Sequence, residues 1–432
     1  MKSKFNIAIW AGNGIGGTEK AAVLFAVELA RRGHRPVYIS PPGPRDAALT
    51  QGNVPRITPL GSASALAEFL NTEQIQVIHQ HVPGYFHPTP IYDALRLLGG
   101  QRPHLIETNI FGRFDDPKGD PWIDFRCFVS CSSAVQAFRR SRRSLTIGAL
   151  AKSTVLYNPV APLDDATRQR LQRDEIRREL GLQAHEIFIL RFGRAGPKWN
   201  RDEVRVFQQA RRRNASLRIL LMEPPEAIWR EVEAGRWGDG IILRRALSDF
   251  DRLAALYSAG DLMLHMSDWG ESFGYTIAEA MQHSLPVITR STPWCDNAQV
   301  ELVEHGVTGY VCNSHAGAAE GLIRLAADSM LRLQFGAAAA KRIVPLSNLD
   351  HETDLLEEII RHLVAGEQFH EVSQRNHELL QFQSTFATRE RRVFELELPS
   401  MKIAHLKGAS YGAYRSFRAQ VGRFKSALKT RS

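Results

Sequence analysis

Two glutamates in the second half of the sequence have the spacing of a ligand-binding pair. Glu271 lies in a predicted loop after a strand, and Glu279 lies one to two turns inside the helix that follows. At a rise of ~1.5 Å per helical residue, both carboxylates could bind hydroxyls of one extended ligand. The backbone amides of Phe273 and Gly274 stand at the start of that helix, where the dipole favours phosphate. A nucleoside diphosphate sugar carries both groups; the alternative is a surface helix with two glutamates.

Two cations lie on a glycine-containing loop upstream of these carboxylates. Arg194 and Lys198 follow the predicted strand Ile187–Phe192. In a parallel sheet this loop lies at the carboxyl end of the strand, on the same edge as Glu271, where ligands of such folds bind. The two cations could therefore neutralise a diphosphate leaving group. The alternative is a pair of solvated basic residues.

A glycine-rich loop follows the first predicted strand, and Gly12, Gly14 and Gly17 have the spacing G-x-G-x-x-G. Such a loop can turn tightly and bring a ligand to helix amides. A dinucleotide site also needs an acidic residue about 20 positions later, at the end of the second strand. Residues 38–42 read Tyr-Ile-Ser-Pro-Pro there, which disfavours a dinucleotide oxidoreductase, although an NADP variant using Arg45 stays open. The other alternative is a turn that needs glycine for steric reasons only.

The elements that must position these residues alternate between β-type runs and helical patterns, such as the helix predicted over Thr18–Arg32. This alternation predicts βαβ units and parallel sheets. The first predicted strands are Asn6–Trp10, Pro36–Ser40, Gln76–His81, His104–Thr108, Phe125–Ser130 and Thr154–Tyr157. The second set is Ile187–Phe192, Arg218–Met222, Ile241–Leu243, Leu262–His265, Pro286–Thr289 and Tyr310–Cys312.

We therefore predict an α/β protein with two doubly wound, Rossmann-like parallel-sheet domains. The proline-containing residues 158–162 and the charged helical stretch after them are interpreted as the connection. The predicted units are a first domain over 1–160, a linker and helix over 161–185, a second domain over 186–345, a helical extension over 346–400 and a basic amphipathic tail over 401–432.

Composition limits the class of protein. The 432 residues are 44% hydrophobic and 23% charged, as in ordinary globular proteins. Four scattered cysteines are too few for a disulfide framework, and no Cys/His pairs have zinc-site spacing, so we assign neither metal nor cofactor and expect a reduced cytoplasmic location. Neither an export signal nor a run of ~18 apolar residues is visible.

The net charge of +9 is concentrated at the C-terminus. Residues 401–432 contain eight basic and no acidic side chains, so residues 1–400 carry only +1. Apolar residues recur at helical spacing from Tyr414 to Leu428, a pattern typical of a helix on an anionic membrane surface. The alternatives are a helix docked on the first domain or a disordered tail. Because no nucleic-acid-binding motif accompanies the charge, we expect no nucleic acid partner.

Several separated pieces of the sequence form an ordered set: Gly16–Glu19, Val77–His81, Val155–Val160, Arg177–Leu182, Arg194 with Lys198, Glu271–Glu279, and Glu301–Val303 with Gly306–Tyr310. In this order they resemble the retaining glycosyltransferases of family 4, within glycosyl transferases group 1, which have the GT-B fold of two domains facing across a cleft. The resemblance covers about residues 5–345.

The resemblance implies transfer from a nucleoside diphosphate sugar of UDP or GDP type, without a metal, to a glycan or lipid-linked acceptor. Glu279 would bind the ribose, Glu271 the donor sugar, and Arg194 and Lys198 the departing diphosphate. His81 would face the reacting sugar, with His79 as the second choice. The remaining implied donor-binding residues are Gly16, Gly17, Ser272, Phe273 and Gly274.

Two further predictions concern the class of protein and its location. The alternative to an enzyme is a catalytically silent sugar-nucleotide-binding or scaffold protein of the same fold. If residues 401–432 bind a membrane, the protein would be peripheral on its inner face.

Overall fold

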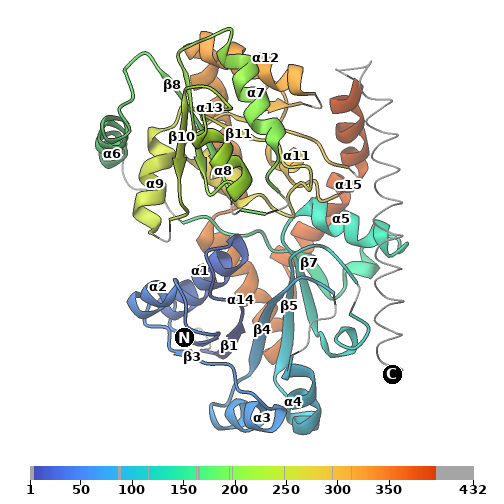
Figure 1. Ribbon diagram of the computed structural model, residues 1–432. Helices are drawn as coiled ribbons and strands as arrows, with labels where there is room; N and C mark the ends of the chain where they lie inside the picture. The colour runs from blue at the N-terminus through green and yellow to red at the C-terminus, as the bar shows by residue number, and fades with distance from the viewer. Residues whose placement is uncertain are drawn as a thin grey trace, which may run out of the picture.

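The computed structural model describes residues 4–85, 89–114, 116–161, 163, 166–193, 195–196, 198–247, 249–293, 295–312 and 314–395. Its strands form two separate parallel sheets, each flanked by helices (Figure 1). We call the seven-stranded sheet with its helices the first half and the six-stranded sheet with its helices the second half. The predicted fold class, with two doubly wound parallel sheets, is confirmed.

The first sheet has all its neighbouring strands in parallel pairs. β4 is buried at all six positions, as expected for a strand covered on both faces. In spatial order the strands are β3 (Arg56–Ile57), β2 (Arg35–Ile39), β1 (Asn6–Trp10), β4 (Val77–Val82), β5 (His104–Asn109), β6 (Phe125–Phe128) and β7 (Ser153–Val155).

Several strand ends of this sheet differ by one or two residues from the sequence prediction, and two differences have a clear local reason. β3, at two residues, was not predicted because it is too short to show a period. β6 ends at Phe128 rather than Ser130, because Ser130 caps the next helix. Its hydroxyl accepts from the Ser133 amide at 2.9 Å, and the Ser133 hydroxyl accepts from the Ser130 amide at 3.1 Å.

Helices cover both faces of the first sheet. Phe25 and Leu29 of α1 pack in one apolar cluster with Ile7 and Ile9 of β1. The helices are α1 (Gly17–Arg31), α2 (Asp46–Gln51), α3 (Ala63–Thr72), α4 (Ile91–Leu98) and α5 (Cys131–Arg140), with short 3-10 turns at Gly99–Gln101, Asp120–Trp122 and Gly148–Leu150.

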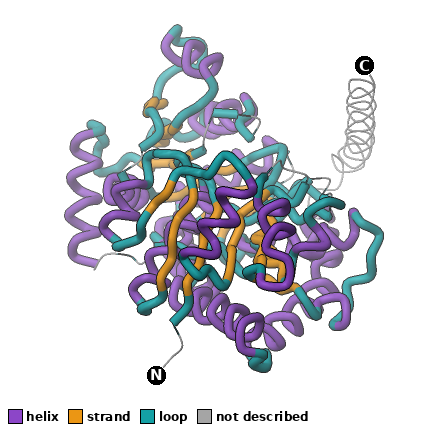
Figure 2. The backbone as a smooth tube through the Cα atoms, turned by 90° about the horizontal axis from the view of Figure 1, so that it is seen from below, coloured by secondary structure: helices purple, strands orange, loops and turns teal. Residues whose placement is uncertain are grey.

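The second sheet repeats this plan. Figure 2 shows the molecule from below, with strands flanked by helices. The order of the second sheet is β10 (Ile241–Arg244), β9 (Leu217–Met222), β8 (Ile187–Phe192), β11 (Leu262–His265), β12 (Val287–Thr289) and β13 (Gly309–Val311). Its helices are α6 (Ala166–Glu179), α7 (Arg201–Arg211), α8 (Glu226–Glu233), α9 (Phe250–Ala259), α10 (Tyr275–Gln282), α11 (Gln299–Leu302), α12 (His315–Ala327) and α13 (Ser329–Leu346).

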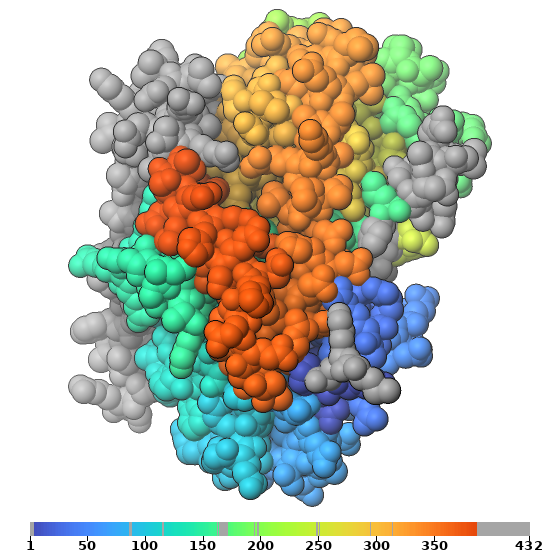
Figure 3. Space-filling model, turned by 180° about the vertical axis from the view of Figure 1, so that it is seen from behind, coloured from blue at the N-terminus to red at the C-terminus, as the bar shows by residue number. Residues whose placement is uncertain are grey.

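The last two described helices return to the first half. Leu356 and Ile360 of α14 (Leu349–Ala365) are fully buried in the cluster that contains Ile7 and Phe25. α15 (Glu371–Glu395) packs against β7 and α5. From behind, the orange and red of these helices adjoin the blue and teal of the first half (Figure 3). Within the predicted helical extension over 346–400, α14 and α15 are separated by residues 366–370, which are not helical, and the described chain ends at residue 395.

Over the described residues the chain therefore passes between the halves twice, and the two crossings touch. The Val160 amide, after β7, donates to the Ser347 carbonyl at 3.0 Å, just before α14. Val160 and Asn348 form a parallel bridge there.

No helix in the described part of the chain has the length and apolar content needed to cross a membrane. The basic tail, residues 401–432, lies outside the described residues.

Candidate active site

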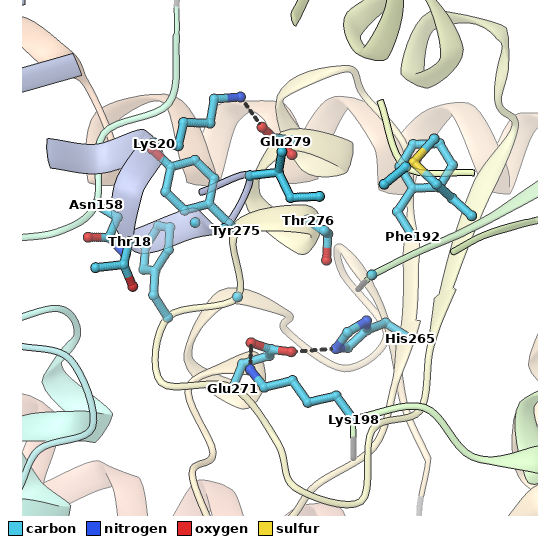
Figure 4. Close-up of a pocket in the computed structure, with 18 of the residues that line it drawn as sticks. Thr18, Lys20, Asn158, Phe192, Lys198, His265, Glu271, Tyr275, Thr276 and Glu279 are labelled. Atoms are coloured by element: carbon cyan, nitrogen blue, oxygen red, sulfur yellow. Dashed lines mark hydrogen bonds and ion pairs between the residues drawn. The ribbon is translucent and has the colours of Figure 1, made fainter. Parts of the chain in front are cut away.

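A cavity of about 470 Å³ lies between the halves, within the size range of small-molecule sites (Figure 4). The first half contributes the loop before α1 and the start of that helix, including Gly16, Gly17 and Lys20. The second half contributes loops at the carboxyl ends of β8 and β11 together with α10. The predicted residues that line it are Gly16, Gly17, Lys198, Glu271, Ser272, Phe273, Gly274 and Glu279.

The Glu271 carboxylate is held from two sides. Its Oε2 lies 2.5 Å from Lys198 Nζ, and its Oε1 lies 2.9 Å from His265 Nε2. Burial raises the pKa of Glu271, but the Lys198 ammonium and the His265 ring outweigh this effect and lower the pKa to about 2. The Glu271 amide donates to Gln299 Oε1 at 2.9 Å, which fixes the loop. Glu271 is therefore an ionised acceptor in a fixed position.

The Glu279 carboxylate lies inside α10 and is bound by residues that the sequence did not single out. Its Oε1 forms an ion pair with Lys20 Nζ, from α1 of the first half. Its Oε2 accepts from Tyr257 Oη at 2.8 Å. Burial raises the pKa of Tyr257 well above its usual value, and the nearby Glu279 charge adds to this effect, so the phenol stays a donor.

The start of α10 faces the glycine loop. Gly274 is the N-cap with φ of 101°, a left-handed conformation that favours glycine. A side chain at Gly17 would place its Cβ 2.8 Å from Cδ2 of Tyr275, so glycine is required for this close approach. The Ser272 carbonyl accepts from Ser130 Oγ of the first half at 2.6 Å. The amides of α10 are thus brought against the loop that precedes α1.

The loop after β8 carries the predicted cations. Lys198 lines the cavity, whereas Arg194 lies outside the described residues. A further cation in the lining, Arg191, is fully buried, with its guanidinium 2.7 Å from Glu203 and 4.1 Å from the centre of the Trp199 ring. Arg191 was not predicted to lie there, because an arginine inside a strand suggests no ligand contact.

His81 is not among the described residues that line the cavity. It is buried near the end of β4, with its ring 4.4 Å from that of His79. Burial lowers the pKa of His81 well below its usual value, and the neighbouring His79 adds to this effect. His79 Nε2 lies 2.8 Å from Thr108 Oγ1, and burial lowers the pKa of His79 to about 3. The structure therefore brings neither histidine to the cavity, and the role predicted for His81 stays a prediction.

A buried carboxylate that is not part of the cavity lining also joins the halves. Glu301, in α11, accepts from the amides of Cys131 and Ser132 at 3.1 and 2.8 Å, and from Tyr157 Oη at 2.7 Å. Both amides lie in the first turn of α5 of the first half, where the helix dipole favours a negative charge. Burial raises the pKa of Glu301, although these hydrogen bonds oppose the shift. Sequence spacing could not reveal this contact, because its partners lie far apart in the chain.

Two other sequence alternatives can be compared with the structure. The Arg45 guanidinium, considered for an NADP phosphate, lines the cavity but also donates to the Gly14 carbonyl at 3.2 Å. No group of three or more His, Cys, Asp or Glu side chains with the geometry of a metal site occurs within the described ranges.

One family model matches part of the second half. Residues 187–328 match the family described as Glycosyl transferases group 1, which confirms the resemblance to that group over that segment. None of the curated proteins matches the chain.

Solved structures share the fold at low sequence identity. A glycosyltransferase from Rickettsia africae superposes with a TM-score of 0.67 at 15% identity, covering 84% of this chain and 100% of the other. HepE from Anabaena, solved with UDP and glucose, has a TM-score of 0.63 at 18% identity, and the match covers 82% of this chain and 98% of HepE. A putative UDP-N-acetylglucosamine 2-epimerase from Listeria monocytogenes has a TM-score of 0.56 at 11% identity, and the match covers 85% of this chain and 98% of the epimerase. The chain thus has the GT-B fold, which different enzymes share.

Proposed function

We propose that this chain, whose residues 187–328 match glycosyl transferases group 1, is a retaining glycosyltransferase. It moves a sugar from a nucleoside diphosphate sugar of UDP or GDP type to a glycan or lipid-linked acceptor. The observation that carries the proposal is one cavity that holds two separated carboxylates, a lysine and the start of a helix. Carboxylates accept from hydroxyls, whereas the ammonium and the amides donate to phosphate. A sugar nucleotide has hydroxyl groups on its ribose and on its sugar with a diphosphate between them, which matches this arrangement of acceptors and donors.

The proposal assigns one contact to each part of the donor. The Glu279 carboxylate accepts from the ribose hydroxyls, and the Glu271 carboxylate accepts from hydroxyls of the transferred sugar. The diphosphate lies between them, at the start of α10 and beside Lys198. Arg194, which lies outside the described residues, is proposed as the second cation on that loop.

Charge stabilisation supplies the chemistry in this scheme. The bond between the anomeric carbon and the phosphate oxygen breaks, and negative charge grows on the diphosphate. The Lys198 ammonium and the α10 dipole stabilise that charge. The acceptor oxygen bonds to the anomeric carbon on the same face, and its proton passes to the departing phosphate oxygen. The scheme needs no separate base and no metal ion.

A panel of candidate donors tests the proposal. We expect one nucleoside diphosphate among UDP, GDP and ADP to raise the thermal midpoint of unfolding, and its sugar conjugates to release that diphosphate when an acceptor is present. Binding without release under every donor and acceptor pair would instead support a catalytically silent binding protein. Protection by NAD(P) alone would support an oxidoreductase and refute the proposal.

Location and acceptor delivery form a second part of the proposal. A glycan or lipid-linked acceptor would enter from the first half, which faces the donor site across the cavity. Membrane attachment through residues 401–432 stays a prediction, and vesicles with and without anionic lipid test it on the full chain and on a chain ending at residue 400.

A further inference from the structure

Lys20 reaches from one half of the protein into the donor site of the other. It lies in the second turn of α1, and its ammonium pairs with Glu279 in α10. The side chains of Lys20 and Glu279 are only 11% and 8% exposed. The ion pair is therefore largely removed from water, where breaking it without a new partner is costly.

This ion pair occupies the carboxylate that the proposed function assigns to the ribose. One oxygen of Glu279 faces Lys20, and the other accepts from Tyr257. Because so little of Glu279 is exposed, two ribose hydroxyls can reach both oxygens only if one of these partners moves. The Lys20 side chain has a flexible four-carbon stem, whereas the Tyr257 ring is fixed among Phe192 and His283. Lys20 is therefore the partner that a ribose would displace.

The displaced ammonium has a second anion within its reach once a donor is present. Lys20 Nζ lies 5.5 Å from the centre of the Tyr275 ring, and Tyr275 is the first residue of α10. Lys20 also lines the same cavity as Gly16, Gly17 and Lys198. A diphosphate bound in this cavity at the start of α10 would therefore offer Lys20 a new partner.

We propose that Lys20 exchanges partners when the donor binds, leaving Glu279 to the ribose and pairing with the diphosphate. The inference rests on the proposed function and adds a donor-binding residue supplied by the first half. It follows that a nucleoside alone binds poorly, because it breaks the ion pair and offers no anion in return. A nucleoside diphosphate completes the exchange, so the site selects phosphorylated ligands and Lys20 links the first half to the bound diphosphate.

The test compares Lys20→Met with the parent, using the nucleoside diphosphate that stabilises the parent most and its matching nucleoside. In the variant the nucleoside no longer competes with the Lys20 ammonium for Glu279. The nucleoside diphosphate, in contrast, loses the cation that would pair with its phosphates. By calorimetry we expect nucleoside affinity to rise and nucleoside diphosphate affinity to fall, each about tenfold. Lys20→Arg, which keeps the charge, should restore diphosphate affinity to within about threefold of the parent.

Two controls separate this exchange from simpler effects. Lys198→Met should weaken the diphosphate without raising nucleoside affinity, because Lys198 pairs with Glu271 rather than Glu279. Lys341→Met, at an exposed position of α13, should change neither affinity. Thermal unfolding of each variant shows that it folds.

Opposite changes in the two affinities support the inference. Equal losses of both affinities in Lys20→Met would assign Lys20 a supporting role only and overturn it, as would no change in either. Failure of the parent to bind any nucleoside diphosphate is a different result, because it refutes the proposed function itself.

Discussion

Glu301→Ala tests whether a single buried carboxylate joins the two halves. The change removes the acceptor of the Cys131 and Ser132 amides at the start of α5 and of the Tyr157 hydroxyl. Tyr157 keeps a neighbour in Cys131 Sγ at 3.1 Å, whereas the two amides lose their side-chain acceptor in a buried contact.

The expected magnitude follows from these groups. A buried donor without an acceptor costs ~1–3 kcal/mol, so the two amides together cost ~2–6 kcal/mol. Removing a carboxylate whose pKa is raised by burial relieves part of this cost. We expect the free energy of unfolding to fall by ~3 kcal/mol at neutral pH. The amide of Glu301→Gln keeps one acceptor oxygen for three donors, so its loss should be about half as large.

Chemical unfolding followed by tryptophan fluorescence measures the change, with Glu304→Ala as the matched control. Glu304 lies three positions away, and its carboxylate is 45% exposed beside Arg342 at 3.4 Å. Loss of such a surface pair costs at most ~1 kcal/mol. If Glu301→Ala unfolds at the same denaturant concentration as Glu304→Ala, the carboxylate does not hold the halves together and the reasoning fails.

Three further predictions concern the cavity. Glu279→Ala should weaken nucleoside diphosphate binding about 30-fold by calorimetry, from ~2 kcal/mol of lost hydrogen bonding to the ribose; unchanged affinity would contradict its assignment. Lys198→Ala should lower kcat about 100-fold and change KM much less, because its charge acts on the departing diphosphate; a change in KM alone would contradict this. The pKa of Glu271 is lowered to about 2, so its stabilising contribution is present above pH 4.5 and is lost only as pH falls through about 2. Initial rates should therefore show no acid limb from Glu271 between pH 8 and pH 5, whereas Glu271→Gln should be slow throughout that range.

Much of the fold was predictable because its strands are short apolar runs bounded by glycine or polar residues. The predictions for Asn6–Trp10, Ile187–Phe192 and Leu262–His265 coincide with β1, β8 and β11. The predicted strand ends were wrong where a residue has another local role. Ser130, for example, caps α5 instead of extending β6. The return of α14 to the first half was not predictable, because an amphipathic helix does not specify which apolar surface it will cover.

Within the site, the residues found from sequence are those that lie on one loop and one helix. Glu271 and Glu279 share a segment, so their separation could be calculated from helical rise alone. Lys20 was missed because its partner lies 259 positions away, and a lysine in a helix normally faces solvent. The direction of the His81 side chain could not be predicted from alternation of polar and apolar residues, because every residue of β4 is buried. Long-range pairs and the direction of a buried side chain require coordinates.

The contact between Val160 and the Ser347–Asn348 segment limits how the protein can move. Because these two connections run side by side, we expect them to act as one pivot about which the halves rotate when the width of the cavity changes. Glu301 and Lys20 connect the halves at two further places. The Glu301 contact involves no ligand, whereas the proposed donor would move Lys20 from Glu279 to the diphosphate. A chain cut before residue 347 would lose one strand of the pivot and the helix that covers α1, so the first half cannot be expressed as residues 1–160 without exposing that apolar surface.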